Sequence, residues 1–222
     1  MNRFEELLQR SAILHQHLCP RQVLGVRMGL AGGRWLGIDV PQKDKRLLTI
    51  VETDGCGADG IAVATGCSMG RRTMYFYDFG KVAATFVDTD TRRAVRVVPS
   101  SLSRKLAKRY APEAESRWHA YLLGYQRMPD EELLDIREVS LTISVAELLS
   151  KDGYRVSCDI CGEEIINERE VLREGLTLCR ACAGGRYYYP TNEQAEPLTT
   201  ASGPVKVGKG ADQWYHSDRN GC

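Results

Sequence analysis

The stretch VETDGCGADGIAVATGCSMGRRTMYFYDFGKVAATFV, residues 51–87, decides how this chain folds. The apolar, β-branched residues that lead into it predict a buried strand, and the polar run from Glu52 to Gly55 ends that strand. Cys56 is therefore expected just past a strand end. The small apolar residues 58–64 then predict one short helix.

The second half of this stretch predicts a loop and two more strands. Cys67 lies between two glycines after the short helix, and residues 73–77 and 82–87 are apolar and aromatic enough for strands. A turn at residues 78–80 would join these strands as a hairpin. We therefore expect two cysteines on loops above an antiparallel sheet.

Gly55, Gly57 and Gly60 also match the GxGxxG pattern of dinucleotide-binding folds, in which a helix N-terminus faces a pyrophosphate. The helix predicted after them has about two turns, which is shorter than a parallel crossover requires. Two carboxylates, Glu52 and Asp54, would also stand near the phosphates. Three glycines alone are a weak signal, so dinucleotide binding is disfavoured.

Composition and charge are those of an ordinary globular protein. The chain has 222 residues, of which 43% are hydrophobic and 27% are charged, and this length suits one or two domains. Thirty basic and twenty-nine acidic side chains leave a formal charge of +1, so no long-range attraction draws the chain to nucleic acid or an anionic membrane. The sequence contains no apolar run of membrane-spanning length and no secretory signal pattern, which predicts a cytoplasmic protein.

Histidine and cysteine side chains follow the first predicted helix, residues 3–14, in the pattern LHQHLCP. His15, His17 and Cys19 lie close together in the sequence, and the proline after them begins a second helix. Imidazole and thiolate groups suit zinc, nickel, copper or iron. We therefore expect a transition-metal or catalytic site here, with Cys56 as a fourth participant. The alternative is a pair of polar helix-end histidines beside a small buried cysteine.

The strongest signal lies further along the chain, in CDICGEEIINEREVLREGLTLCRAC. Two CxxC pairs, separated by a hairpin-sized interval, supply four thiolates for a closed tetrahedral zinc site: Cys158, Cys161, Cys179 and Cys182. Because such a site leaves no open position for catalysis, its zinc is structural and supplies folding energy to a small module. Without a secretory signal, eight cysteines are better explained by metal or redox chemistry than by disulfides.

The pattern as a whole predicts an α+β protein with two domains. A mixed helix and antiparallel-sheet core domain is expected over residues 1–150, and a small treble-clef-like zinc finger over residues 154–189, with a hairpin around Gly175. The polar residues 151–153 mark the expected boundary. Residues 190–222 show little periodicity, so they are expected to form a tail or extended arm.

Two basic clusters raise the question of nucleic-acid binding. The first lies on a predicted helix and consists of Arg104, Lys105, Lys108 and Arg109. Glu113 and Glu115 follow it at once, so a solvated helix face is the simpler interpretation. The second combines two arginines of the zinc finger with three consecutive tyrosines. Five glutamates make that module locally acidic, and protein binding or self-association is favoured over nucleic acid.

Three of these segments, in this order, resemble the E-subunit family of formylmethanofuran dehydrogenase. They are LHQHLCP at residues 14–20, ETDGCGADGIAVATGCSMG at residues 52–70 and DFGKVAATF at residues 78–86. Members of that family also carry a C-terminal four-cysteine zinc module. The resemblance covers about residues 10–185, and it departs from the family pattern at Gln16 and Arg21, which stand where glycines are usual.

This resemblance implies an α+β core with an auxiliary treble-clef zinc finger, often in dimers, and a metal-linked site. Carried onto this sequence, the site consists of His15, His17, Cys19 and Cys56, with three further residues nearby in the pattern: Cys67, Asp59 and Lys81. Members are encoded with, or named after, molybdenum or tungsten formylmethanofuran dehydrogenases, which reduce carbon dioxide to a formyl group. The resemblance therefore implies a homodimer, molybdenum or tungsten enzyme subunits as candidate partners, and a methanogenesis-related oxidoreductase role.

Two functional hypotheses follow from these observations. In the first, the core domain binds a second transition metal, zinc, nickel or iron, whose open coordination position would allow catalysis. Cys56, Cys19 and His17 would then be the catalytic residues, and the same thiols could also act in redox chemistry without a metal. In the second, the chain is a non-enzymatic accessory or regulatory protein whose zinc finger binds protein or nucleic acid.

Overall fold

The computed structural model describes residues 2–149, 151 and 153–188, and the chain divides into two compact units, Met1–Val145 and Ala146–Cys222. The first unit holds the central sheet, and the second holds the two CxxC pairs. The break predicted at residues 151–153 falls inside the second unit. The tail predicted for residues 190–222 lies outside the described residues.

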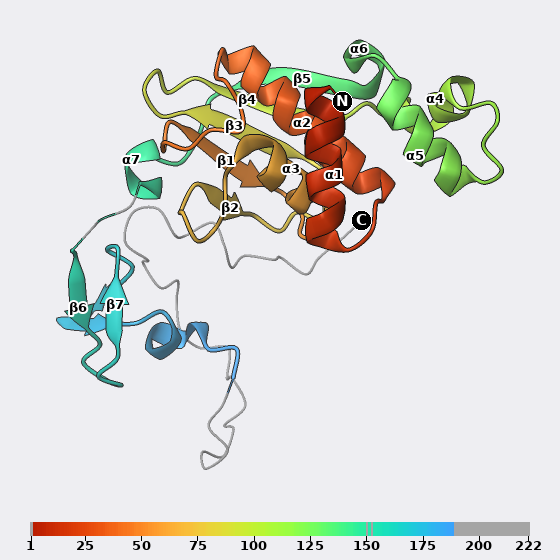
Figure 1. Cartoon of the computed structure of the whole chain (residues 1–222). Helices are drawn as coiled ribbons and strands as arrows, with labels where there is room; N and C mark the ends of the chain where they lie inside the picture. The colour runs from red at the N-terminus through yellow and green to blue at the C-terminus, as the bar shows by residue number, and fades with distance from the viewer. Residues whose placement is uncertain (1, 150, 152, 189–222) are drawn as a thin grey trace. The chain divides into compact units, whose positions relative to one another are not determined.

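A five-stranded sheet forms the centre of the first unit, in the order β2-β1-β3-β4-β5 (Figure 1). Its strands are β1 (Leu47–Val51), β2 (Met74–Phe76), β3 (Ala84–Asp88), β4 (Ala94–Pro99) and β5 (Leu134–Val139). Each of β3, β4 and β5 is antiparallel to the neighbour before it, whereas β2 is parallel to β1. The predicted class of mixed helix and sheet is confirmed, with a mixed sheet in place of a purely antiparallel one.

The hairpin predicted between residues 73–77 and 82–87 is wrong, because β2 and β3 lie on opposite sides of β1. Strands β1 and β2 are instead joined by a parallel crossover through α3 (Cys56–Thr65). The sequence predicts a helix too short for such a crossover, but the loops on either side of it supply the missing length. Cys56 is therefore the first residue of a helix, and Cys67 follows the end of the same helix.

Three helices lie on one side of the sheet: α1 (Arg3–His15), α2 (Pro20–Leu36) and α3 (Figure 1). α2 packs on β3 and β4, and α1 packs on α2 and α3. A proline occupies the first turn of α2, as the sequence predicts, and Asn2 and Glu5 form a capping box at the start of α1 that the sequence analysis did not anticipate. The hydrophobic core lies between helices and sheet, and its largest fully buried side chains include Leu7, Met28, Leu47 and Phe86. This burial is the main source of stability for the first unit.

Glycines bring α2 and α3 close together. A Cβ atom added at Gly25 would lie 2.2 Å from the carbonyl oxygen of Gly57, and one added at Gly60 would lie 2.5 Å from that of Gln22. Because backbone atoms in a packed interior cannot move aside as a flexible side chain can, no larger residue fits at this crossing without a shift of one helix. The crossing places the N-terminal turn of α3, and with it Cys56, against the N-terminal half of α2.

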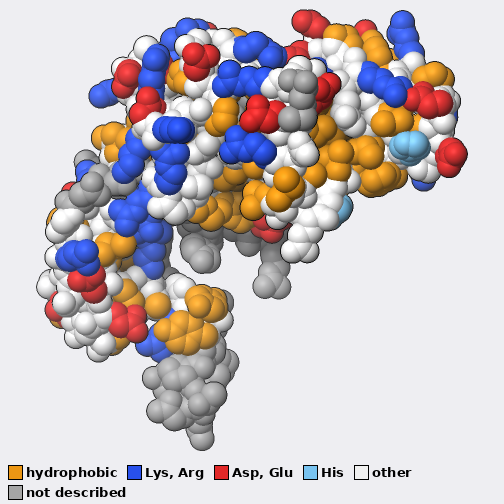
Figure 2. Space-filling model, viewed as in Figure 1, with side chains coloured by type: hydrophobic (Ala, Val, Ile, Leu, Met, Phe, Trp, Pro, Cys, Tyr) orange, Lys and Arg blue, Asp and Glu red, His pale blue; other side chains and the backbone are white. Residues whose placement is uncertain are grey.

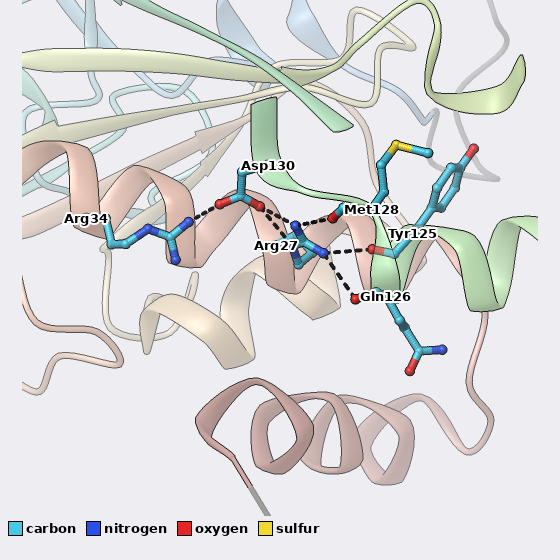
Figure 3. A network of polar contacts seen from close by, with 6 residues as sticks. All are labelled: Arg27, Arg34, Tyr125, Gln126, Met128 and Asp130. Carbon is cyan, nitrogen blue, oxygen red and sulfur yellow. Dashed lines mark hydrogen bonds and ion pairs between the residues drawn. The ribbon is translucent and has the colours of Figure 1, made fainter. Parts of the chain in front are cut away.

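A polar network fastens α2 to the segment that joins α5 (Arg117–Arg127) to α6 (Asp130–Leu133), as Figure 3 shows. The Arg27 guanidinium donates to the carbonyl oxygens of Tyr125 at 2.9 Å and Met128 at 2.8 Å. It also pairs with the carboxylate of Asp130, which accepts from Arg34 as well. The side chain of Arg27 is 13% exposed and that of Arg34 is 62% exposed, so only the first arginine fills a buried position.

The second unit contains two small antiparallel hairpins and a short helical turn. The elements are β6 (Arg155–Ser157) with β7 (Glu164–Ile166), β8 (Val171–Arg173) with β9 (Leu176–Leu178), and η1 (Ala181–Gly185). The hairpin predicted around Gly175 is thus confirmed. Its hydrophobic cluster has few buried members: Cys158, Ile165, Val171, Leu178 and Ala183. A core this small needs an additional source of stability, such as a bound metal.

Two further helices complete the described chain, α4 (Ser103–Tyr110) and the four-residue α7 (Val145–Leu148). On the face shown in Figure 2, basic and acidic side chains are interspersed over the first unit, as expected from the formal charge of +1. Within residues 2–149, 151 and 153–188, none of the helices combines the length and the apolar character that crossing a membrane requires.

The variant Gly60→Ala is expected to destabilise the first unit, because its methyl group would collide with the backbone of α2. We expect the free energy of unfolding to fall by about 1–3 kcal/mol, as for other overpacked cores. Gly57→Ala is the matched control, since a Cβ atom there would meet nothing closer than 3.8 Å and alanine favours the helix. Urea denaturation measures both, and equal losses for the two variants would contradict this packing argument.

The variant Arg27→Met is expected to lose about 3 kcal/mol of unfolding free energy, because it leaves Asp130 and the carbonyl acceptors without their buried donor. Arg34→Met removes the exposed partner of the same carboxylate, and it should cost less than about 1 kcal/mol. Thermal or urea unfolding compares the two variants. Similar losses for both would show that the network is not anchored by Arg27.

Candidate functional site

Three helix ends converge at the residues that the sequence singles out in the first unit. α1 ends at His15, Cys19 immediately precedes α2, and α3 begins at Cys56. The Nε2 atom of His15 lies 3.0 Å from the Sγ atom of Cys56. Cys19 lies close enough for its thiol to raise the pKa of Cys56. The fold thus places an imidazole in contact with one thiol and a second thiol near them, all from separate segments.

Asp59 completes this cluster from the first turn of α3. Its Oδ2 atom lies 2.8 Å from Nδ1 of His15. A carboxylate can only accept here, so Nδ1 carries the donated hydrogen and Nε2 presents its lone pair to the Cys56 thiol. Asp59 therefore fixes both the tautomer and the orientation of the imidazole. The sequence suggested Asp59 only as a neighbour in the family pattern.

Partial burial and the neighbouring thiol of Cys19 determine whether Cys56 is protonated. Partial burial, followed by the nearby Cys19 thiol, raises the pKa of Cys56 above the ordinary value for a thiol. Cys56 therefore carries its proton at neutral pH in the metal-free chain and donates it toward His15. A cation at this position would have the opposite effect, because it favours the thiolate.

Gln22 positions Cys19, a role that the sequence analysis missed. The side-chain oxygen of Gln22 accepts from the backbone N–H of Cys19 at 2.8 Å, and its amide donates to the carbonyl oxygen of Ser11 at 2.8 Å. Gln22 is fully buried, so these bonds tie the start of α2 to the middle of α1. A glutamine three residues after a helix-capping position is the sequence signal that could have identified it.

The remaining predicted residues lie further from this cluster. His17 is exposed, with its ring centroid 4.6 Å from that of His15. Lys81 lies on the loop after β2, where its backbone N–H donates to the carbonyl oxygen of Glu52. Cys67 follows the opposite end of α3, about 15 Å from Cys56 along the helix, and is buried against Gln42. Cys67 therefore does not belong to the same site.

The second unit gathers all four cysteines of the CxxC pairs. Their Sγ atoms all lie within 4.8 Å of one another, and those of Cys161 and Cys179 are 3.9 Å apart. Tetrahedral zinc–thiolate geometry requires sulfur atoms to be about 3.8 Å apart. Among the described residues this is the one group of three or more candidate ligands that is so compact. The arrangement fits a closed structural zinc site.

Backbone amides support the thiolates of this cluster. The N–H group of Cys179 donates to the Cys158 sulfur at 3.2 Å. The nearby backbone N–H groups, that of Cys161 first and that of Cys179 next, lower the pKa of Cys158 to about 6. The N–H group of Cys182 donates to the Cys179 sulfur at 3.3 Å. Such hydrogen bonds are the outer contacts that hold metal ligands in the ionised state.

Together, the α+β unit and the four-cysteine module define a class of metal-binding proteins with a zinc finger attached to a mixed-sheet core. The family model described as FmdE, molybdenum formylmethanofuran dehydrogenase operon, matches residues 14–135, and the prokaryotic dksA/traR C4-type zinc finger model matches residues 153–188. The chain belongs to the FmdE family, as its three sequence motifs predicted.

Two known proteins resemble the chain over most of its length. A probable S-adenosyl-L-methionine-binding protein of Archaeoglobus fulgidus is 27% identical over 206 residues, which cover 84% of this chain and 55% of that protein. The chain thus spans about half the length of this curated relative. A tungsten formylmethanofuran dehydrogenase FmdE-like protein from Syntrophus aciditrophicus has a similar fold, with a TM-score of 0.56 and 22% identity over 84% of this chain and 95% of that one.

Replacing Cys161 by serine is expected to remove one equivalent of zinc per chain and to unfold the second unit, because its small core depends on the metal. Elemental analysis counts the zinc, and amide hydrogen exchange of residues 164–178 reports the folding. Ser157→Ala, a change beside the cluster that removes no ligand, should leave both readouts unchanged. Full zinc content in the Cys161→Ser protein would contradict a four-thiolate site.

Proposed function

We propose that this protein binds a second transition-metal ion in its first unit, at His15 and Cys56 with Cys19 beside them. The contact between His15 and Cys56 carries this proposal, because an imidazole lone pair and a sulfur atom face each other at 3.0 Å. The bond from Asp59 to the other ring nitrogen supports it, since metal-bound histidines usually donate that N–H to a carboxylate.

The chemistry of the donor set favours a borderline or soft cation. Imidazole and thiolate groups suit zinc, nickel and iron, whereas magnesium and calcium prefer oxygen ligands. His15 and Cys56 form a close pair, but among the described residues only the four cysteines of the second unit bring three or more candidate ligand atoms together so compactly. A site with two or three protein ligands leaves coordination positions for water or a substrate, and His17 lies close enough to His15 to serve at its edge.

The family membership suggests where such a site would act. We propose a role in or beside molybdenum or tungsten one-carbon redox metabolism, on the strength of the family description and of the name of the Syntrophus aciditrophicus protein. In that setting Cys56, Cys19 and His17 would contact the substrate or the metal. The partners would be molybdenum or tungsten enzyme subunits, and the protein would act as a homodimer, which sedimentation or light scattering can measure.

Metal analysis of single variants tests the core site. The wild-type protein is expected to hold two metal ions per chain, and Cys56→Ser or His15→Ala should hold one, the zinc of the second unit. Asp59→Asn should keep the ligands but weaken metal affinity by about 10- to 100-fold. His119→Ala, a histidine change on α5, is the control. One metal ion per wild-type chain would refute the core site.

A second candidate function is supported by apolar side chains on the surface of the second unit. Tyr187 is 95% exposed and Leu172 is 71% exposed, and Ile160 adds to them. We propose as the alternative a non-enzymatic accessory or regulatory protein whose zinc finger binds another protein. Relaxation of water protons by a paramagnetic metal in the core site separates the two candidates. Rapid water exchange favours catalysis, and its absence favours the accessory role.

A further inference from the structure

A cavity of about 270 Å³ lies between α4 and α5, and none of the core-site residues line it. The residues that line it are mostly polar: Arg104, Lys108, Ala114, Glu115, Ser116, Arg117, Ala120 and Tyr121. The two helices pack closely, since a Cβ atom added at Gly124 would lie 2.5 Å from the carbonyl oxygen of Ala107. The side chains of both helices therefore converge on one opening.

The lining carries an excess of positive charge. Three cationic side chains, Arg104, Lys108 and Arg117, face a single carboxylate, that of Glu115. The other acidic residue of this segment, Glu113, does not line the cavity, because its carboxylate pairs with Arg127. The sequence suggested that Glu113 and Glu115 together offset the basic residues. In the structure Glu113 pairs with Arg127 instead, so the cavity lining keeps a surplus of about two positive charges.

A specific contact holds one of these cations in place. Lys108 donates to the carbonyl oxygen of Ala114, which fixes its amine at the cavity and leaves further N–H donors for a ligand. Arg104 lies near Tyr125, where burial raises the pKa of the phenol and the charge of Arg104 partly offsets that rise. The ring of Tyr125 in turn stacks on Tyr121, with the centroids 5.6 Å apart and the planes 2° from parallel. Charged and aromatic walls are thus arranged before any ligand binds.

We propose that this cavity binds a small phosphorylated molecule. Guanidinium groups match phosphate oxygens in a two-point geometry, and lysine adds a compact charge. The positive end of α5, capped by Ser116 within the same lining, adds a weaker attraction for an anion. The volume of about 270 Å³ lies just below the range of about 300–1,000 Å³ that is usual for small-ligand pockets, so a mononucleotide is near the upper limit of size. The charged lining side chains are exposed to solvent, where a small anion can reach them, whereas a net charge of +1 gives the chain no long-range attraction for a nucleic acid.

Binding of AMP and of inorganic phosphate to the full-length protein tests this proposal, by calorimetry at low ionic strength. We expect saturable binding of AMP, and inorganic phosphate should compete with it. Arg117→Gln and Lys108→Gln should each weaken binding by about tenfold, as the loss of a charged hydrogen bond predicts. Lys105→Gln is the control, because this exposed lysine lies on the same helix but does not line the cavity.

Three outcomes would overturn the proposal. If neither AMP nor phosphate binds, the cavity is not an anion site. If all three variants weaken binding equally, or if a single-stranded oligonucleotide binds and AMP does not, the attraction belongs to the helix surface instead of the cavity. Metal content is measured in the same samples. Because the cavity shares no residue with either metal cluster, loss of anion binding with metal retained leaves the proposed function untouched.

Discussion

The close crossing of α2 and α3 is the constraint on which the first unit depends. Gly25 and Gly60 let two backbones meet where any side chain would force them apart. Cys19 immediately precedes α2, and Cys56 is the first residue of α3. The distance between the starts of the two helices therefore determines whether the two thiols can interact. Of these two glycines, Gly60 is also the last glycine of the pattern that resembles a phosphate-binding loop, and in the structure it serves helix packing. A resemblance to a ligand motif can therefore arise from helix packing alone.

Hydrogen bonds between polar side chains further fix the helix arrangement that this packing sets. Buried Gln22 connects the start of α2 to Ser11 of α1, and Asp59 holds His15 from the first turn of α3. Each of these bonds joins two of the three helices around the candidate site. Leaving the buried amide of Gln22 unpaired is costly, so its bonds restrict α1 and α2 to one arrangement, whereas the part-exposed Asp59 mainly orients the imidazole of His15. The candidate site is thus oriented by groups that are not themselves predicted ligands.

Local signals allowed much of this structure to be predicted from the sequence. The helix starts at Asn2 and Pro20 and the hairpin around Gly175 depend on residues a few positions apart. The strand at residues 73–77 was predicted, but its parallel pairing with β1 was missed, because sequence proximity favoured a hairpin with the next strand and the short helix α3 argued against a crossover. The pairing of His15 with Asp59 depends on residues 44 positions apart in the sequence, which only the family pattern hinted at.

The four-cysteine cluster and the cluster around His15 and Cys56 differ in whether folding depends on metal binding. All four cysteines of the second unit come from one short segment with a small core, so metal binding and folding are coupled there. The groups of the first unit come from three helices that the large hydrophobic core already holds in place. Those groups are held by the protein alone, so the ion proposed for them would not be needed to complete the fold. A preorganised site of this kind can release or exchange its ligand while the surrounding unit stays folded, whereas the closed thiolate site cannot.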